Sequence, residues 1–393
     1  MSIIVQKYGG SSVATPAHIR RVARRVVETR QRGHDVVVVV SAMGNTTNDL
    51  LDLAGSVSDN PHRRELDMLV TVGERISMAL LSMAIHDLGH PAVSFTGSQS
   101  GIITTDAHTH ARIVKVKPDR VRQALSTGQI VIVAGFQGVS ERLEITSLGR
   151  GGTDATAVAM AAALGAECAE ICSDVDGVYS ADPRVVPEAR KLDEIGYAEM
   201  QTLADAGAKV LHAEAVEWAR REGIDVHCVA TDDPHRAGTR VGPTPEAPDQ
   251  RVVAVTHHKA MFHLEPEVAG QPAPHGLPAL LAAHGASGSE LWMLPMGWAA
   301  AVPQQNVHGV EAFEEALDRL GGIRVRRDLT WITVVGRKLT APPGLGQRAV
   351  RCLELKQVPI RGTLVDPGRL RFLVDQAHAT TAVQALHRTL IEG

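Results

Sequence analysis

The chain has 393 residues, of which 44% are hydrophobic and 21% are charged, a balance typical of a soluble globular protein. Its formal net charge is −4, and no block of Lys or Arg indicates a groove for nucleic acid. Polar residues interrupt every apolar stretch well before the ~20 residues that a membrane span needs. We therefore expect two or three domains, with neither nucleic acid nor a membrane as a partner.

The cysteines give no pattern for a metal site or a disulfide framework. The sequence contains Cys168, Cys172, Cys228 and Cys352. No two of them form a CxxC pair and no histidine cluster completes a zinc pattern, so we expect buried free thiols and no metal held by the protein. The chain also begins without the charged leader and apolar core of a signal peptide, which predicts a cytoplasmic protein.

The chain opens with a strand, a glycine-rich turn, a helix and a second strand. Residues 3–5 are a short apolar run, and KYGGSS (7–12) follows. Thr15 and Pro16 then open a helix, because a hydroxyl caps the first turn and the missing N–H of proline costs nothing there. The run DVVVVV (35–40) fits a strand buried on both faces, as in a parallel sheet. These segments predict a βαβ unit.

The alternation of helices and strands continues to about residue 240. We expect helices near 62–88, 118–127, 155–165, 197–205 and 208–221, and strands near 92–95, 101–104, 129–136, 168–173 and 224–229. This order predicts a layered α/β domain over residues 1–240, built on a mostly parallel sheet.

The composition changes after this domain. Residues 234–250 are rich in Pro and Gly and indicate a linker, which we place at 241–250. Beyond it, a strand-helix-strand-strand-helix-strand order can be drawn twice, which predicts two smaller α+β units at 251–325 and 326–393. The first unit has expected strands at 259–264, 290–294 and 299–303 and helices at 276–284 and 309–319. The second has expected strands at 330–336, 357–364 and 369–374 and helices at 343–354 and 377–390.

Two glycine-rich turns carry the strongest chemical signals. In the first, Gly9 and Gly10 let the backbone approach a phosphate, and Lys7 adds a point charge for a transferring phosphoryl group. A tight turn with a surface lysine explains this motif equally well. The second turn, GRGGTD (149–154), offers the planar guanidinium of Arg150 for a carboxylate. Asp154 could alternatively serve only to favour the helix dipole.

Other segments are weaker signals for a ligand. SDVDGVYSADPR (173–184) follows a buried strand, and its Tyr179 could cover a base or ribose while Arg184 reaches phosphates; a plain turn is the alternative. TVGERIS (71–77) places Gly and Glu inside a helix, an awkward choice for a purely structural helix. GAKVLH (207–212) opens a helix with a lysine in its first turn, which favours a bound anion.

These segments, in this order, resemble the aspartate kinases of the amino-acid kinase family. The matching segments are KYGGSS, SAMGNTTN, LVTVGERIS, FTGSQSG, AGFQGV, SLGRGGTDATA, SDVDGVYSADPR and GAKVLH, across residues 1–240. The resemblance implies an amino-acid kinase-type layered α/β sandwich that phosphorylates the side-chain carboxylate of L-aspartate with ATP. The product would be 4-phospho-L-aspartate, the first step toward lysine, threonine and methionine.

The resemblance also implies roles for individual residues. The expected ATP site consists of Lys7, Tyr8, Gly9, Gly10, Ser173, Asp174, Tyr179, Arg184, Lys209 and Val210, with Mg²⁺ carried by the nucleotide. The expected aspartate site consists of Ser41, Thr47, Glu74, Arg150, Gly151, Gly152 and Thr153. In it Arg150 would bind the α-carboxylate and Glu74 the ammonium. Lys7, Asp154 and Lys209 would be catalytic. Thr153 stands where the family usually has Ser.

The C-terminal region departs from the family pattern. Related enzymes carry two ferredoxin-like ACT domains there, which bind lysine or threonine and dimerise. Here residues 251–325 and 326–393 are compatible with that pair, the first in degenerate form, and imply a homodimer. The effector-binding segments are replaced by EPEVAGQPAPHG (265–276) and LWMLPM (291–296), so we expect weakened or absent feedback inhibition.

Two other functions stay open at this point. The chain could be a non-catalytic or pathway-dedicated paralogue that serves as a regulatory subunit. It could also phosphorylate another small amino or hydroxy acid, for which Thr153 is the one hint within the pocket. The intact set of Lys7, Glu74, Arg150, Asp154 and Lys209 favours an active kinase.

Overall fold

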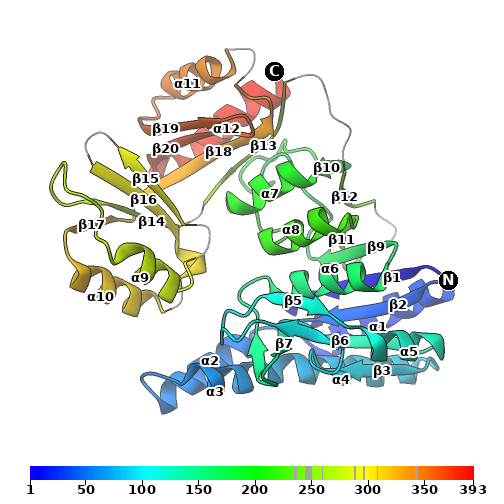
Figure 1. Cartoon of the computed structure of the whole chain (residues 1–393). Helices are drawn as coiled ribbons and strands as arrows, with labels where there is room; N and C mark the ends of the chain where they lie inside the picture. Colours follow the sequence, from blue (N-terminus) through cyan, green and yellow to red (C-terminus); the bar gives the residue numbers. More distant parts are fainter. Residues whose placement is uncertain are drawn as a thin grey trace. The chain divides into compact units, whose positions relative to one another are not determined.

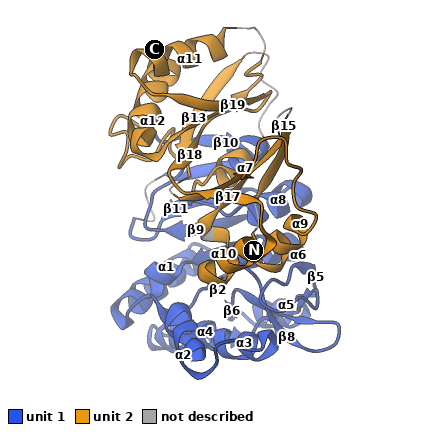
Figure 2. Ribbon diagram, turned by 90° about the vertical axis from the view of Figure 1, so that its left-hand side faces the viewer, with its two compact units in different colours: residues 1–178, 191–201, 209–245 blue, residues 179–190, 202–208, 246–393 orange. Residues whose placement is uncertain are grey.

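The computed structural model divides into two compact units (Figure 2). It describes residues 1–233, 237–243, 250–258, 260–286, 289–294, 297–307, 309–340 and 344–393. Unit 1 comprises Met1–Val178, Lys191–Gln201 and Lys209–Pro245, and unit 2 comprises Tyr179–Arg190, Thr202–Ala208 and Glu246–Gly393. Two short segments from the N-terminal 240 residues therefore fold with the C-terminal part of the chain.

Unit 1 is built on an eight-stranded sheet in the order β10-β12-β11-β9-β1-β2-β6-β3. Its strands are β1 (Ile3–Tyr8), β2 (Asp35–Val40), β3 (Ala92–Phe95), β6 (Ile130–Ala134), β9 (Cys168–Ser173), β10 (Glu194–Gly196), β11 (Val226–Ala230) and β12 (Thr239–Gly242). All neighbours pair in parallel except β11 and β12. The predicted α/β class with a mostly parallel sheet is confirmed.

Helices cover both faces of this sheet (Figure 1). The α-helices of residues 1–233 are α1 (Pro16–Gln31), α2 (Thr46–Val57), α3 (Arg63–Val70), α4 (Val72–Asp87), α5 (Asp119–Ser126), α6 (Gly152–Leu164), α7 (Tyr197–Asp205), which is divided between the units after Gln201, and α8 (Ala213–Glu222). On one face, α1 and α4 bury Val22, Val26 and Leu81 against Val38 and Ile132 of the sheet. The small-residue helix α6 packs against β1, β2 and β9 and against α8. Thr15 caps α1 and Pro16 begins it, as predicted.

A second sheet in unit 1 leads into the glycine-rich turn at 149–154. Its order is β5-β4-β7-β8, with β4 (Ile102–Thr104), β5 (Ile113–Val116), β7 (Gln137–Ser140) and β8 (Ile145–Ser147). Ala111 also pairs with Leu148, directly before the turn. Of these four strands the sequence pattern predicted only β4.

The stretch Arg63–Asp87 is long and apolar enough to cross a membrane by length and composition alone. The predicted helical stretch at 62–88 is confirmed, with a break at Thr71 that divides it into α3 and α4. Leu81 and Ile85 of α4 are fully buried in the core beside α1. The apolar composition of this stretch is therefore accounted for in part by a helix layer of unit 1.

The predicted linker was also partly wrong. Residues 239–242 form β12, which pairs with β10 and β11 and extends the sheet of unit 1. Residues 244–249 of the predicted linker, and residues 234–236 of the Pro- and Gly-rich stretch before it, lie outside the described residues.

Unit 2 contains two four-stranded sheets. The first, in the order β15-β16-β14-β17, comprises β14 (Met261–Pro266), β15 (Glu290–Leu294), β16 (Gly297–Pro303) and β17 (Ile323–Arg326), with helices α9 (Leu277–Ala283) and α10 (Val310–Leu320). The second, in the order β13-β18-β20-β19, comprises β13 (Arg251–His257), β18 (Leu329–Arg337), β19 (Ile360–Asp366) and β20 (Arg369–Asp375), with helices α11 (Leu345–Leu355) and α12 (Ala379–His387) and the terminal turn η4 (Arg388–Glu392).

One strand pairs across the boundary that the sequence suggested. β13 lies in the range expected for the first small unit (251–325), but it pairs antiparallel with β18 of the second sheet. In its sheet β13 lies next to β18, just as β17 lies next to β14 in the other sheet. The sequence pattern also missed β17 itself.

Candidate functional site

The ends of three adjacent strands bring several predicted residues to one edge of the main sheet. In the register of the sheet, Tyr8 of β1 lies beside Val40 of β2 and Cys172 of β9. Gly9, Ser41 and Ser173 consequently leave the parallel strands at the same carboxyl edge, where open α/β sheets bind their ligands.

An ion pair joins the two glycine-rich turns. The Nζ atom of Lys7 lies 2.7 Å from Oδ1 of Asp154, and both side chains are largely buried, at 13% and 12% exposure. The lysine amine also lies 3.3 Å from the point where a Cβ at Gly9 would stand. The convergence of the two turns, on which the kinase hypothesis depends, is therefore present in the structure. Asp154 is thus more than a residue that favours the helix dipole.

Gly151 is required by a close approach of His212. Gly151 has a φ of +75°, and a Cβ there would lie 1.9 Å from Cγ of His212. The backbone N–H of His212 donates to Oδ2 of Asp154 at 3.3 Å. His212 thus fixes both the turn and its carboxylate. Sequence reasoning did not select His212, although it ends the GAKVLH segment.

Thr153 is held from two sides. Its Oγ1 accepts a hydrogen bond from Oγ of Ser41 at 3.1 Å. A Cβ at Gly135, directly after β6, would lie 2.6 Å from the Thr153 methyl carbon. The extra methyl relative to serine therefore occupies space that a glycine leaves free.

Glu74 is a buried carboxylate with one oxygen available. The residue is 2% exposed, and its Oε1 accepts a hydrogen bond from the Ala42 backbone N–H at 3.0 Å. Burial raises the pKa of Glu74 to about 7. Its Oε2 has no hydrogen-bond partner among the described residues, which is costly unless a ligand provides one. Gly73 permits this placement, because a Cβ there would lie 2.6 Å from the Ala42 Cβ.

Other predicted residues in unit 1 are accessible. Arg150, Asp174 and Lys209 are exposed and form no ion pair within the part of the chain that the structure describes. Thr47 is half-buried in the first turn of α2. Lys209 does not open a helix, as the sequence suggested, but lies in the loop between α7 and α8. The dipole argument for its role was therefore wrong.

The predicted nucleotide segment is divided between the units. Ser173 and Asp174 belong to unit 1, whereas Tyr179 and Arg184 belong to unit 2. The Arg184 guanidinium binds Asp182 through Nε at 2.9 Å and Nη2 at 2.8 Å. The structure thus brings Lys7 together with Gly9 and Asp154, but it does not group Tyr179 and Arg184 with them.

A buried polar cluster beside the same sheet edge escaped the sequence analysis. Oγ of Ser12 lies 2.8 Å from Oγ1 of Thr231, the residue that follows β11. Arg25 of α1 is 6% exposed and donates to the carbonyl oxygens of Ala230 and Thr231. No local motif marks these residues, apart from an arginine on the apolar face of a helix. They fix the loop after β11.

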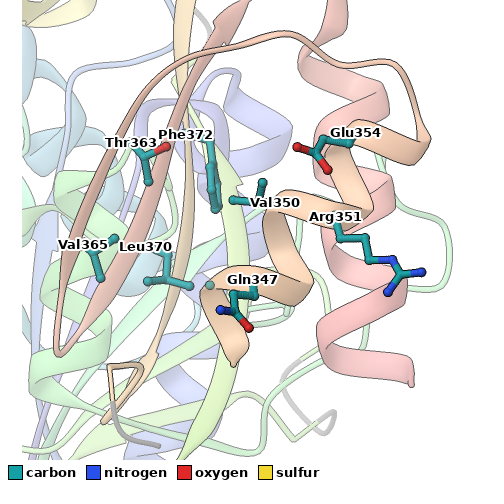
Figure 3. Close-up of a pocket in the computed structure, with 9 residues that line it drawn as sticks. Gln347, Val350, Arg351, Glu354, Thr363, Val365, Leu370 and Phe372 are labelled. Atoms are coloured by element: carbon teal, nitrogen blue, oxygen red, sulfur yellow. The ribbon is translucent and has the colours of Figure 1, made fainter. Parts of the chain in front are cut away.

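A pocket of about 630 Å³ lies in unit 2, between α11 and strands β19 and β20 (Figure 3). Gln347 and Val350 of the helix point toward Leu370 and Phe372 of the sheet. The pocket contains none of the predicted catalytic or substrate-binding residues, so it does not bear on the chemistry of unit 1.

Comparison with known proteins identifies the family. The model of the amino acid kinase family matches residues 2–230. An aspartokinase from Geobacillus stearothermophilus is 39% identical over 400 residues, which cover 98% of this chain and 97% of that protein. This chain belongs to the aspartokinases of the amino acid kinase family.

Other aspartokinases match over different lengths. The protein from Mycolicibacterium smegmatis is 60% identical over 228 residues, and this match covers 58% of the present chain. The chain thus spans about half the length of that relative, 54%. Among solved structures, E. coli aspartokinase III in complex with aspartate and ADP (R-state) covers 99% of both chains, with a TM-score of 0.82 and 26% identity. The same enzyme in complex with lysine and aspartate (T-state) gives a TM-score of 0.76.

Proposed function

We propose that this aspartokinase family member transfers a phosphoryl group from ATP to the side-chain carboxylate of L-aspartate, giving 4-phospho-L-aspartate. The single observation that supports this most is the 2.7 Å ion pair of Lys7 and Asp154 at the carboxyl edge of the parallel sheet. It holds a positive charge where a phosphate would meet the Gly9 turn and the N-terminus of α6.

The residues at this edge suit phosphoryl transfer to a carboxylate. An aspartate side chain is already ionised at neutral pH, so the acceptor needs no general base. The remaining requirements are in-line positioning and compensation of negative charge. We assign charge compensation to Lys7 and to the exposed Lys209. Asp154, which accepts the His212 N–H, holds the Lys7 amine in place.

We assign the aspartate pocket to residues around the second glycine turn. The exposed Arg150 would bind the α-carboxylate bidentately, and Oε2 of Glu74 would accept the ammonium. Ser41, Thr47, Gly151, Gly152 and Thr153 would complete the pocket. Because the ammonium favours an ionised Glu74, aspartate binding would weaken as Glu74 takes up its proton.

We assign nucleotide binding to Lys7, Tyr8, Gly9, Gly10, Ser173, Asp174, Tyr179, Arg184, Lys209 and Val210. Gly9 fits a phosphate because it leaves space beside the Lys7 amine, whereas Gly10 lets the turn pack closely against the Ala42 carbonyl, 3.0 Å from where its Cβ would stand. The described residues contain no group of three or more His, Cys, Asp or Glu side chains that could hold a metal. We propose that Mg²⁺ enters on the phosphates of the nucleotide.

The organisation of the chain completes the proposal. We assign catalysis to residues 1–240 and ACT-like units to 251–325 and 326–393, the last receiving β13 as its edge strand; of the predicted linker at 241–250, residues 241–242 belong to β12 instead. A homodimer through these C-terminal units and a cytoplasmic location are part of the same proposal. The free, buried state of all four cysteines is compatible with a reducing compartment.

A coupled assay of ADP release tests the function. The enzyme would be assayed with Mg-ATP and a panel of L-aspartate, L-glutamate, N-acetyl-L-glutamate, D-aspartate and L-malate, with Lys7→Ala as background control. We expect release that depends on L-aspartate and is lost in the variant. Release with another acid alone would favour a different acceptor, for which the Thr153 methyl would be the first residue to test. No release with any acid would favour the non-catalytic regulatory subunit.

A further inference from the structure

The segment 179–190 is part of the hydrophobic core of unit 2. Ala181 and Val186 are 4% and 2% exposed, and they belong to one core cluster with residues of α11, α12, β18 and β20. Val383 and Leu386 of α12 lie in the same cluster. The segment continues directly from β9 and the loop that follows it in unit 1, yet its core contacts are with the C-terminal part of the chain.

A chain of buried polar groups ties the same segment to the C-terminus. Oγ of Ser180 lies 2.8 Å from Nε2 of His387, and Nδ1 of His387 lies 2.8 Å from Oε1 of Glu392. Ser180 and His387 are 1% and 0% exposed. Oγ of Ser180 also accepts the Arg190 N–H at 2.9 Å. The Glu392 carboxylate can only accept, so Nδ1 of His387 donates to it, and the Ser180 hydroxyl, which can both donate and accept, is the partner of Nε2.

This serine does not serve as a nucleophile. Its side chain is buried, its hydroxyl already accepts a backbone N–H, and its own N–H and C=O are bonded to Arg190 and Val255. A nucleophile needs an approach for substrate, which a side chain that is 1% exposed does not offer. The contacts fix the position of the segment.

Two further bonds hold the segment on other sides. The Val255 N–H of β13 donates to the Ser180 carbonyl at 2.8 Å. Nε2 of Gln384, on the exposed face of α12, donates to the Val185 carbonyl at 2.8 Å. Segment 179–190 therefore has core contacts and hydrogen bonds from both β13 and α12.

A second segment also belongs to unit 2 and lies next in sequence to two candidate nucleotide-binding residues, Lys209 and Val210. Residues 202–208, which directly precede Lys209, group with unit 2. Gly207 has a φ of +97°, and a Cβ there would lie 2.9 Å from Nδ1 of His258. His258 is 8% exposed and forms a hydrogen bond with the Asp205 backbone.

We propose that His387 is a positioning residue for nucleotide binding: through Ser180 it sets the place of Tyr179 and Arg184. The inference rests on the proposed role of these two residues in binding ATP. It predicts that the buried contacts of segment 179–190 within unit 2 affect the affinity for ATP. Aspartate affinity, which depends on residues of unit 1 alone, is independent of His387.

Matched variants of exposed positions test this without disturbing the core. Glu392→Ala removes the acceptor for Nδ1–H, whereas Glu392→Gln keeps an acceptor oxygen. Gln384→Ala removes the bond to Val185, and its exposed neighbour Thr381→Ala is the control. We expect Glu392→Ala and Gln384→Ala each to raise the KM for ATP about fivefold, the equivalent of one lost hydrogen bond, with the KM for aspartate unchanged. Glu392→Gln and Thr381→Ala should match the wild type.

A core variant and a direct binding measurement separate positioning from general damage. Leu317→Ala in α10 weakens the other sheet of unit 2 without contacting segment 179–190 and should leave the KM for ATP unchanged. His387→Ala should give the largest loss of ATP affinity. Titration calorimetry with Mg-ATP alone measures the affinity for ATP directly, so it tests the inference even if aspartate is not the acceptor. Wild-type affinity in Glu392→Ala and Gln384→Ala, or equal shifts for ATP and aspartate, would overturn it. Absent aspartate-dependent ADP release in the wild type would overturn the proposed function instead.

Discussion

The two units position their candidate residues by different means. In unit 1, Lys7, Ser41 and Ser173 stand at the ends of paired strands, so the register of the sheet alone brings them to one edge. In unit 2, Tyr179 and Arg184 lie on an irregular segment that is held by core packing and by His387, more than 200 residues away in the chain. Strand ends fix a site rigidly, whereas a packed segment can move with the unit that holds it.

The largest expected effect comes from breaking the ion pair in unit 1. Lys7→Ala or Asp154→Ala should lower kcat by about 10²- to 10³-fold or more, because the charge facing the transferring group is lost or misplaced. Steady-state ADP release measures this, with circular dichroism to verify the fold. Lys115→Ala, an exposed lysine of β5, is the matched control and should be fully active. Near-normal kcat in either site variant would refute the assigned roles.

The next largest effect should come from Gly151, and α6 supplies the matched control. Gly151 and Gly165 stand at opposite ends of this helix with φ values of +75° and +66°. Gly151→Ala adds a clash with His212, whereas a Cβ at Gly165 meets no atom within 4 Å. We expect about a hundredfold loss of kcat/KM in Gly151→Ala, because the Asp154 turn shifts. Gly165→Ala should lose stability but keep the kcat/KM of the wild type. Equal activity in the two variants would contradict this.

The pH dependence of aspartate binding tests the role of Glu74 in unit 1. Its pKa of about 7 predicts that the KM for aspartate rises as the pH falls below 7, because the carboxylate that binds the ammonium becomes protonated. Glu74→Gln should raise this KM about 30-fold and remove that pH dependence. A KM profile across this range in both proteins, with KM for ATP as the internal control, is the measurement. A wild-type profile that stays flat would exclude Glu74 from aspartate binding.

Protonation of Glu74 weakens aspartate binding, but it should stabilise the folded chain. Between pH 4.5, the ordinary pKa of a glutamate, and about 7, the folded chain keeps a proton that the unfolded chain has lost. The folded state then binds more protons, so stability falls as the pH rises through this window. Glu74→Gln should therefore raise Tm above pH 7, by the equivalent of up to roughly 3 kcal/mol, and not below pH 4.5. Thermal denaturation at both ends of the window tests the sign.

The smallest expected effect concerns effectors of unit 2. The replaced segments 265–276 and 291–296, of which 295–296 lie outside the described residues, predict that millimolar lysine or threonine changes activity by less than about fivefold, the lower end of allosteric coupling. ADP release at subsaturating aspartate, with each amino acid alone and both together, measures this. Strong inhibition would show that the effector site survives despite the altered segments.

Sequence reasoning succeeded where a local pattern determines the structure. The runs at 35–40 and 168–173 became buried parallel strands, and both glycine turns reached the same sheet edge. It failed for β5, β7, β8 and β17, which have only three or four residues and too few alternations to give a period. It also broke down at Lys209, where a loop takes the place of the expected first helical turn.

The residues that sequence reasoning missed depend on contacts made far along the chain. Arg25 is bound by carbonyls more than 200 positions away, and His212 is explained only by its approach to Gly151. Neither contact can be inferred from the spacing of neighbouring residues in the sequence. The division of the nucleotide segment between two units was equally invisible, because SDVDGVYSADPR is continuous in sequence.

The pairing of β13 with β18 makes one small fold an insertion within the other. Everything from β14 to β17 is looped out between two strands that are hydrogen-bonded neighbours. A fragment that starts at residue 326 would therefore lack an edge strand and leave the long, apolar β18 bare, which invites aggregation. A fragment that keeps the complete four-stranded sheet would therefore have to start before Arg251 and include both small folds.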